Sequence, residues 1–145
     1  MREAGGDEPD YVALFAVTCG TGVRALAERW KDEGHYLRSH TLQALAIECA
    51  EAFAEMLHAR LRTQWGFPDA PGVALADKLK GHYRGMRVSF GYPACPELAD
   101  QRILFDLLDP AQIGLQLTEG FMMDPEASVS ALVFHHPEAK YFKAG

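Results

Sequence analysis

Residues 87–97, with the sequence RVSFGYPACPE, combine the residue types of a ligand-holding loop. No helix or central strand tolerates this density of prolines and glycine, so we expect a shaped loop. The guanidinium of Arg87 offers a planar fork of donors that suits a carboxylate. Gly91 permits close approach of the main chain to a ligand, and Tyr92 can stack on a flat ring. The alternatives are that the loop is a rigid connector and that Arg87 is a structural ion-pair partner.

Cys95 and the histidines are the other side chains that could take part in catalysis or metal binding. A thiol near a helix N-terminus can have a lowered pKa and act as a nucleophile with a histidine base. No Cys-His-Asn pattern accompanies Cys95, which favours a packed thiol. The histidines lack the spacing of a metal site, and we expect surface or core positions for His35, His40, His58, His82, His135 and His136.

Size, charge and cysteine content exclude several classes of protein. The chain has 145 residues, which fits one domain, and a net charge of −6 from 14 basic and 20 acidic residues. That balance disfavours nucleic acid and anionic membrane surfaces as partners. No apolar run approaches the ~20 residues that span a bilayer, and no signal peptide is recognisable. Three well-separated cysteines predict neither a disulfide framework nor a zinc site. The cytoplasm is the expected compartment.

The elements that must position these residues follow from the hydrophobic pattern. Residues 1–10 read as a flexible lead-in, and residues 11–145 as an α+β domain with a small antiparallel β-sheet covered by helices. Strands are expected over 11–18, 114–122 and 128–135, with the last two paired. Helices are expected over 23–33, with Thr21 as the cap, over 39–65 and 74–83, and from Pro96 to Leu108.

The helix over 39–65 is expected to be amphipathic. Its apolar stripe consists of side chains spaced by three and four residues: Leu42, Leu45, Ala46, Cys49, Phe53, Met56, Leu57 and Leu61. Its opposite face is polar and carries Glu48, Glu51, Glu55, His58 and Arg62; apart from a ligand role, the three glutamates are expected to be solvated. Tyr141 lies near an end that would usually fray, so we expect an aromatic side chain at the edge of the core.

The pattern Arg-x-x-x-Gly-Tyr-Pro-Ala-Cys-Pro at 87–96 resembles the S-adenosylmethionine-binding loop of a known family, the activation domain of cobalamin-dependent methionine synthase. The resemblance covers nearly the whole chain. Further motifs occur in the family's order at 10–11, 15–18, 50–55, 57–58, 65–66, 117–119, 127–130, 136–137 and 140–141.

The resemblance implies a module that binds S-adenosylmethionine and docks onto a cobalamin-binding domain after the cofactor has become cob(II)alamin. An electron from flavodoxin or another reductase, with the methyl group of S-adenosylmethionine, would then restore methylcobalamin. The cobalamin itself would be carried by the partner. The residues that the family assigns to S-adenosylmethionine match Arg87, Val88, Ser89, Phe90, Gly91, Tyr92, Glu51 and Tyr141. The chain has no cobalamin-binding Asp-x-His-x-x-Gly motif, so it is not expected to be a complete methyltransferase.

The chain also departs from the family pattern. The family domain is longer at the N-terminus, where an aspartate contacts the ligand, and has a further C-terminal helix. Gly81 stands where the family often has glutamate, while Val23 and Ile47 replace acidic residues. We therefore expect weaker binding and an apolar packing face that a homodimer or a partner covers. Two alternatives remain: an interaction module that completes a split methionine synthase, and an independent enzyme that uses Cys95.

Overall fold

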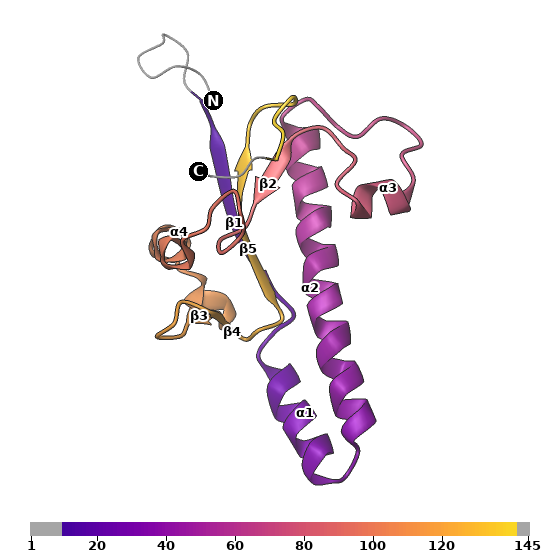
Figure 1. Cartoon of the computed structure of the whole chain (residues 1–145), viewed down its shortest axis with the longest axis vertical. Helices are drawn as coiled ribbons and strands as arrows, with labels where there is room; N and C mark the ends of the chain where they lie inside the picture. Colours follow the sequence, from indigo (N-terminus) through magenta and orange to yellow (C-terminus); the bar gives the residue numbers. More distant parts are fainter. Residues whose placement is uncertain (1–9, 142–145) are drawn as a thin grey trace.

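A three-stranded antiparallel sheet forms the centre of the molecule (Figure 1). The computed structural model describes residues 10–141, apart from the side chain of Leu79, so the expected lead-in lies almost wholly outside the described residues. Strand β5 (Ser128–Phe134) lies between β1 (Val12–Thr18) and β2 (Met86–Val88). In this register Val133 stands between Ala13 on β1 and Arg87 on β2. The fold is α+β with a small antiparallel sheet, as the sequence predicts.

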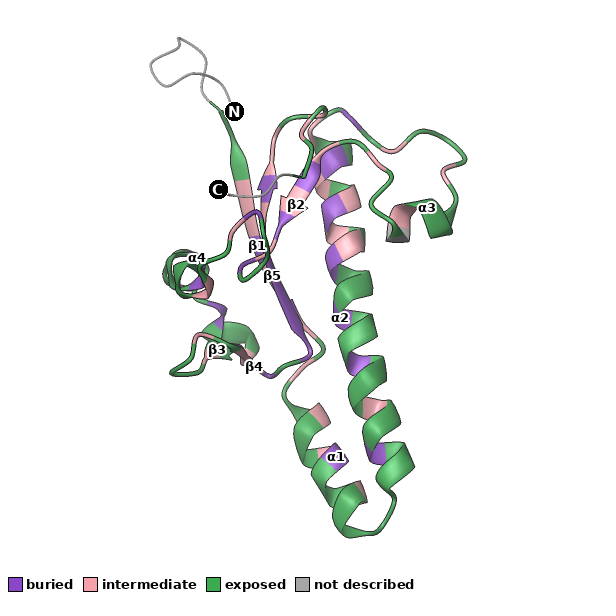
Figure 2. Cartoon of the chain, in the orientation of Figure 1, coloured by how far each residue is buried: buried purple, intermediate pink, exposed green. Residues whose placement is uncertain are grey.

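The long helix α2 (Tyr36–Gln64) covers one face of the sheet, and α1 (Gly22–Asp32) packs beside it. Alternate residues of β1 and β5 point at α2 and form the main core. This core contains Phe15, Val17, Ala50, Ala54, Val129, Ala131 and Val133. Gly34, with φ of +82°, ends α1 and allows the chain to reverse into α2. The two helices form a hairpin that extends beyond the sheet, where most of their surface is exposed (Figure 2).

The buried face of α2 differs from the expected stripe. Leu45, Phe53 and Met56 are exposed, whereas the buried positions follow a row at steps of four: Ala46, Ala50, Ala54, His58 and Arg62. Small alanines let the helix backbone approach the sheet closely, and the row along i, i+4 shares one face. Of the large apolar side chains in the expected stripe, Leu57 and Leu61 do pack against the core, whereas Leu45, Phe53 and Met56 point away from it. His58 and Arg62, which the pattern placed on the polar face, are buried instead, and for His58 this is the core position that the sequence left open.

Helix α4 (Gln101–Leu108) lies on the other side of the sheet from α2 (Figure 1). It begins later than expected, after a 3-10 turn over Leu98–Asp100. The side-chain amide of Gln101 bridges to the sheet, because its oxygen accepts a hydrogen bond from Ser130 and its nitrogen donates to the Phe121 carbonyl at 2.7 Å. On the face of β2 opposite to Arg87, Met86 and Val88 form a second small core cluster with Ala94 of the loop that follows the strand.

Several predicted elements are corrected. The strand expected over 114–122 is only β3 (Gln116–Leu117), and it pairs with β4 (Met123–Asp124) rather than with β5. A tight turn interrupts it, since the amide of Phe121 donates to the carbonyl of Thr118 at 2.9 Å. Helix α3 shrinks to Leu75–Leu79. Thr21 makes no side-chain cap because its own backbone is already helical.

Candidate functional site

A cleft of about 330 Å³ opens between α2, β2, the loop that follows β2 and the C-terminal segment. Its lining residues come from positions far apart in the sequence: Glu51, Glu55, Gly81, Tyr83, Arg87, Ser89, Tyr92 and Tyr141. An adjacent hollow of about 400 Å³ shares Gly81, Tyr83, Arg87 and Tyr141 with it. The fold thus brings together five residues that the sequence singled out, namely Glu51, Arg87, Ser89, Tyr92 and Tyr141, and adds Glu55 and Tyr83 to them.

The alternation of side chains along β2 and the start of the following loop decides which of residues 87–91 reach the cleft. Arg87 pairs opposite Val133, whose side chain belongs to the core under α2, so Arg87 also points to the α2 side. Val88 is 2% exposed and Phe90 is 8% exposed. Their side chains are packed inside, so any contact with a ligand in the cleft would come from their main chain. Gly91 does not line the cleft either.

The loop after β2 is closed by its own backbone hydrogen bonds. The amide of Gly91 donates to the carbonyl of Cys95 at 2.8 Å, and the amide of Cys95 donates to the carbonyl of Tyr92 at 2.8 Å. Gly91 has φ of +79°, which favours glycine, and a Cβ there would lie 3.3 Å from Leu98 Cδ1. This geometry fixes the backbone that presents Tyr92 at the rim of the cleft.

Arg87 is held by two carboxylates from consecutive turns of α2. Its Nη2 lies 3.0 Å from Glu51 Oε2 and 2.9 Å from Glu55 Oε1, and its Nε donates to the same Glu55 oxygen at 3.2 Å. Burial alone would lower the pKa of Arg87, but the hydrogen bonds and charges of Glu55 and Glu51 outweigh it and raise that pKa. The guanidinium is therefore permanently charged. Within the described residues, Nη1 has no hydrogen-bond acceptor.

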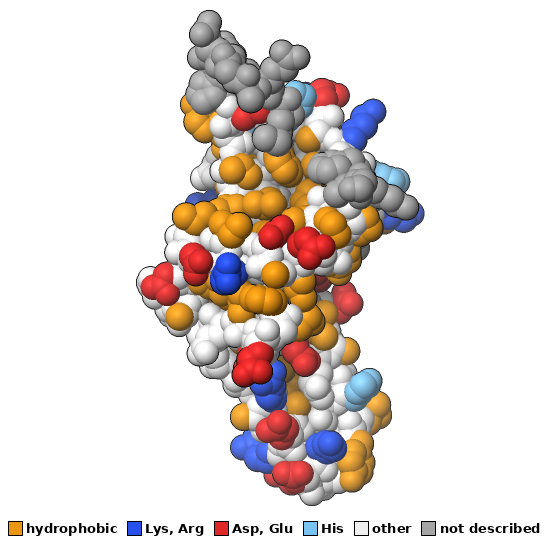
Figure 3. Space-filling view, turned by 60° about the vertical axis from the view of Figure 1, so that its left-hand side comes forward, with side chains coloured by type: hydrophobic (Ala, Val, Ile, Leu, Met, Phe, Trp, Pro, Cys, Tyr) orange, Lys and Arg blue, Asp and Glu red, His pale blue; other side chains and the backbone are white. Residues whose placement is uncertain are grey.

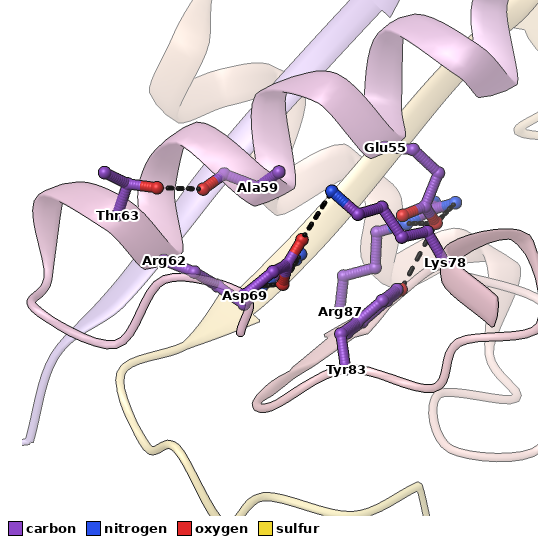
Figure 4. Close-up of polar contacts among 8 residues, drawn as sticks. All are labelled: Glu55, Ala59, Arg62, Thr63, Asp69, Lys78, Tyr83 and Arg87. Atoms are coloured by element: carbon purple, nitrogen blue, oxygen red, sulfur yellow. Dashed lines mark hydrogen bonds and ion pairs between the residues drawn. The ribbon is translucent and has the colours of Figure 1, made fainter. Parts of the chain in front are cut away.

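A buried polar cluster supports the floor of the cleft (Figure 4). The hydroxyl of Tyr83 donates to Glu55 Oε1 at 3.2 Å, and Arg62 Cζ lies 4.1 Å from the centroid of the Tyr83 ring. Arg62 in turn donates to Asp69 Oδ1 from Nε at 3.1 Å and from Nη2 at 2.7 Å. Burial, and then the Glu55 charge, raise the pKa of Tyr83.

Sequence reasoning missed this cluster. Glu55, His58 and Arg62 follow one another on α2 at spacings that look like a solvated helix face. The partners that bury them, Asp69 and Tyr83, come from the segments that follow. A signal exists in the spacing, since His58 and Arg62 continue the row of Ala46, Ala50 and Ala54 at steps of four.

The described residues hold no candidate metal site and no candidate membrane-spanning helix. Among residues 10–141, no three side chains of His, Cys, Asp or Glu are placed to share a metal ion. No helix in the same range is both long enough and apolar enough to cross a bilayer.

The three cysteines are free thiols. Folding brings Cys19, which follows β1, close to Cys49 on α2, and burial and then Cys49 raise the pKa of Cys19. Burial, and then the charge of Asp100, raise the pKa of Cys95. This direction is opposite to that of an activated nucleophile.

We expect Cys95 to react with iodoacetamide at pH 7.5 more slowly than a free thiol such as glutathione, because a raised pKa leaves less thiolate. The rate should rise steadily up to pH 9 without a plateau. Mass spectrometry of the peptide that contains Cys95 gives the rate constants. A rate above that of glutathione would revive the hypothesis of a cysteine enzyme.

Comparison with known proteins agrees with the fold and with the family resemblance. Residues 2–145 match the family of the vitamin B12 dependent methionine synthase activation domain. A crystal structure of the MetH reactivation domain bound to AdoHcy superposes with a TM-score of 0.81 and 40% sequence identity over 91% of this chain. The chain spans 41% of the length of that structure's chain. Because the family match extends over almost every residue and the fold agrees, this protein belongs to the family of methionine synthase activation domains.

Proposed function

We propose that the cleft binds S-adenosylmethionine and presents its methyl group for the reductive remethylation of cob(II)alamin carried by another domain or chain. The observation that carries this proposal is the convergence of Arg87, Glu51, Ser89, Tyr92 and Tyr141 on one cleft from three separate segments of the chain. The related reactivation domain was crystallised with AdoHcy, which is S-adenosylmethionine without its transferable methyl group.

The charges of the cleft complement this ligand. Two carboxylates, Glu51 and Glu55, face one guanidinium, Arg87, so these three side chains carry one net negative charge. S-adenosylmethionine carries a sulfonium, an ammonium and a carboxylate, hence one net positive charge. Nη1 of Arg87, which has no acceptor among residues 10–141, can donate to the ligand carboxylate. The exposed rings of Tyr92 and Tyr141 can pack against the adenine or the sulfonium.

The role in reactivation follows from the chemistry of the sulfonium. Cobalamin on the partner, with one electron from flavodoxin or another reductase, would supply the acceptor for the methyl group, and loss of that group would leave the neutral thioether of S-adenosylhomocysteine in the cleft. This chain's residues would hold the sulfonium near the rim of the cleft, where Glu51, Tyr92 and Tyr141 are exposed. A docked cobalamin domain could approach that rim.

We expect the chain to bind S-adenosylmethionine in isothermal titration, and Arg87→Lys to weaken the affinity by about 10- to 100-fold. Lysine keeps the charge but loses the planar fork of donors. One positive charge remains for Glu51 and Glu55, so the free energy of unfolding should change by less than ~1 kcal/mol.

Arg84→Lys is the matched control, because Arg84 lies three residues away, pairs with Glu138 at 3.1 Å and does not line the cleft. It should leave the affinity unchanged. Equal affinity of Arg87→Lys and the parent would contradict the assigned role of Arg87. No heat at millimolar ligand, on folded parent protein, would overturn the proposed function itself.

An interaction module that completes a split methionine synthase is the second candidate. Apolar side chains are exposed around β1 and α4, including Tyr11, Val12, Ile103 and Leu107. Figure 3 shows hydrophobic side chains gathered on this side of the molecule. Such a surface is typical of a face covered by a partner or by a second copy. Co-purification with a cobalamin protein, together with light scattering of the chain alone, distinguishes the two.

A further inference from the structure

The ring of Tyr83 is fixed from the side of α2 by two buried residues one helical turn apart. Arg62 Cζ lies 4.1 Å from the ring centroid, and the His58 ring meets it edge-on at 5.1 Å with an interplanar angle of 82°. Both supporting side chains are at most 1% exposed. The ring therefore cannot tilt without displacing buried groups of the helix.

The support behind the ring is itself anchored by charge. Both Nε and Nη2 of Arg62 donate to Asp69 Oδ1, and the other oxygen of Asp69 lies 3.2 Å from Lys78 Nζ (Figure 4). These contacts tie the segment after α2, and the last turn of α3 through Lys78, to the guanidinium. Two donors that share one carboxylate oxygen of a half-buried partner hold the plane of Arg62 in one orientation. The face against which Tyr83 lies is thus set by residues that never reach the cleft.

On its other side, Tyr83 acts on the charged groups of the cleft. Its hydroxyl donates to Glu55 Oε1, the same atom that accepts hydrogen bonds from Nε and Nη2 of Arg87. One carboxylate oxygen therefore receives three donors. If the hydroxyl is removed, Arg87 alone holds that oxygen, and the Glu55 side chain gains freedom to rotate. Arg87 would follow Glu55 or shift toward Glu51.

We propose that Tyr83 is a positioning residue for the ligand cleft, which holds Glu55 and through it the guanidinium of Arg87 in the orientation that keeps Nη1 available to a ligand carboxylate. This inference rests on the proposed function, because the ligand is S-adenosylmethionine. The physical gain is preorganisation: a guanidinium fixed before binding loses less entropy when the ligand arrives. Tyr83 acts here through Glu55.

The test is a double-mutant cycle of Tyr83→Phe and Glu55→Gln, read by isothermal titration with S-adenosylmethionine. Phenylalanine keeps the ring and its contacts with Arg62 and His58, so the melting temperature should stay within about 2 °C of the parent. We expect Tyr83→Phe to weaken binding by about three- to tenfold, which corresponds to the loss of one hydrogen bond. Because Tyr83 acts through Glu55, adding Tyr83→Phe to Glu55→Gln should cause little further loss.

Tyr36→Phe is the matched control, since it removes the hydroxyl of an exposed tyrosine at the start of α2, outside the cleft. It should leave the affinity unchanged. Additive effects of Tyr83→Phe and Glu55→Gln would overturn the proposal, because they would show that Tyr83 does not act through Glu55. Unchanged affinity of Tyr83→Phe would overturn it as well.

A ligand-free measurement separates this proposal from the proposed function. The charge of Glu55 and its hydrogen bond raise the pKa of Tyr83, so Glu55→Gln should lower that pKa. The titration of this phenol is obtained to pH 12 by subtracting the ultraviolet absorbance of the variant that lacks it: the double variant from Glu55→Gln, and Tyr83→Phe from the parent. The two difference curves are then compared. An unchanged titration would show that the contact is absent and would overturn the positioning role. A failure of the parent to bind S-adenosylmethionine would instead count against the proposed function.

Discussion

The protein should lose stability steeply as the pH falls below about 6, and His58 should be the main cause. His58 is fully buried, and burial, followed by the charges of Arg62 and Arg87, lowers its pKa from 6.5 to about 3, with Asp69 opposing them. Neither of its ring nitrogens has a hydrogen-bond partner within the described residues.

The sign follows from proton binding in the two states. Between pH 6.5 and about 3, His58 is protonated in the unfolded chain but stays neutral in the folded protein. The stability that comes from neutral His58 is therefore complete above pH 6.5, decreases as the pH falls and is lost below about pH 3. The total contribution is on the order of 4–5 kcal/mol, a large share of the stability of a domain of this size.

Urea unfolding at pH values from 8 to 4 checks this expectation. His58→Leu removes the titrating group from this buried position, so its stability should vary much less across this range. His40→Leu is the control, because His40 is exposed on the same helix and should keep the slope of the parent. Equal slopes for His58→Leu and the parent would show that His58 is not the acid-sensitive group.

The second large effect is expected from Asp69→Ala, which should lower the free energy of unfolding by about 3–5 kcal/mol at pH 7. The substitution leaves Arg62, which is 1% exposed, as a buried charge without its carboxylate. Arg62 already has one nitrogen, Nη1, without a partner in the described part of the chain. Uncompensated burial of a guanidinium is among the costliest defects that a single substitution can create.

Chemical denaturation of two further variants makes this expectation specific. Asp77→Ala removes an exposed carboxylate in α3 and should cost less than ~0.5 kcal/mol. The double variant Arg62→Met and Asp69→Ala removes both charges and should recover most of the loss, because no unpaired charge remains buried. A cost below ~1 kcal/mol for Asp69→Ala would mean that water reaches Arg62.

The sequence by itself determined the features that depend on neighbouring residues. A continuous β-rich run predicts β1, and the spacing of apolar residues predicts α1 and most of α2, although α2 begins at Tyr36 rather than at residue 39. The prolines and Gly91 predict the loop after β2. These signals are local, because hydrophobic period and turn chemistry act within a few residues of the chain. The family resemblance rests on the same contiguous motifs.

Only the tertiary structure decided which face of α2 is buried and which strands pair. Helical spacing is compatible with burial of several adjacent faces of α2. The face with Ala46, Ala50 and Ala54 is the one that packs on the sheet, because small side chains permit close contact. Residues 114–122 and 128–135 look like hairpin partners, yet β5 completes its hydrogen bonds with β1 and β2, which are distant in sequence.

The charged cluster under the cleft belongs to the same class of long-range features. Glu55, His58 and Arg62 are residue types that are common on a solvated helix face. Nothing in the local sequence identifies Asp69 or Tyr83 as their partners. A charge can be buried only where opposite charges and donors surround it. That surrounding is assembled from α2, the loop after it and the segment before β2, so it exists only once the chain has folded.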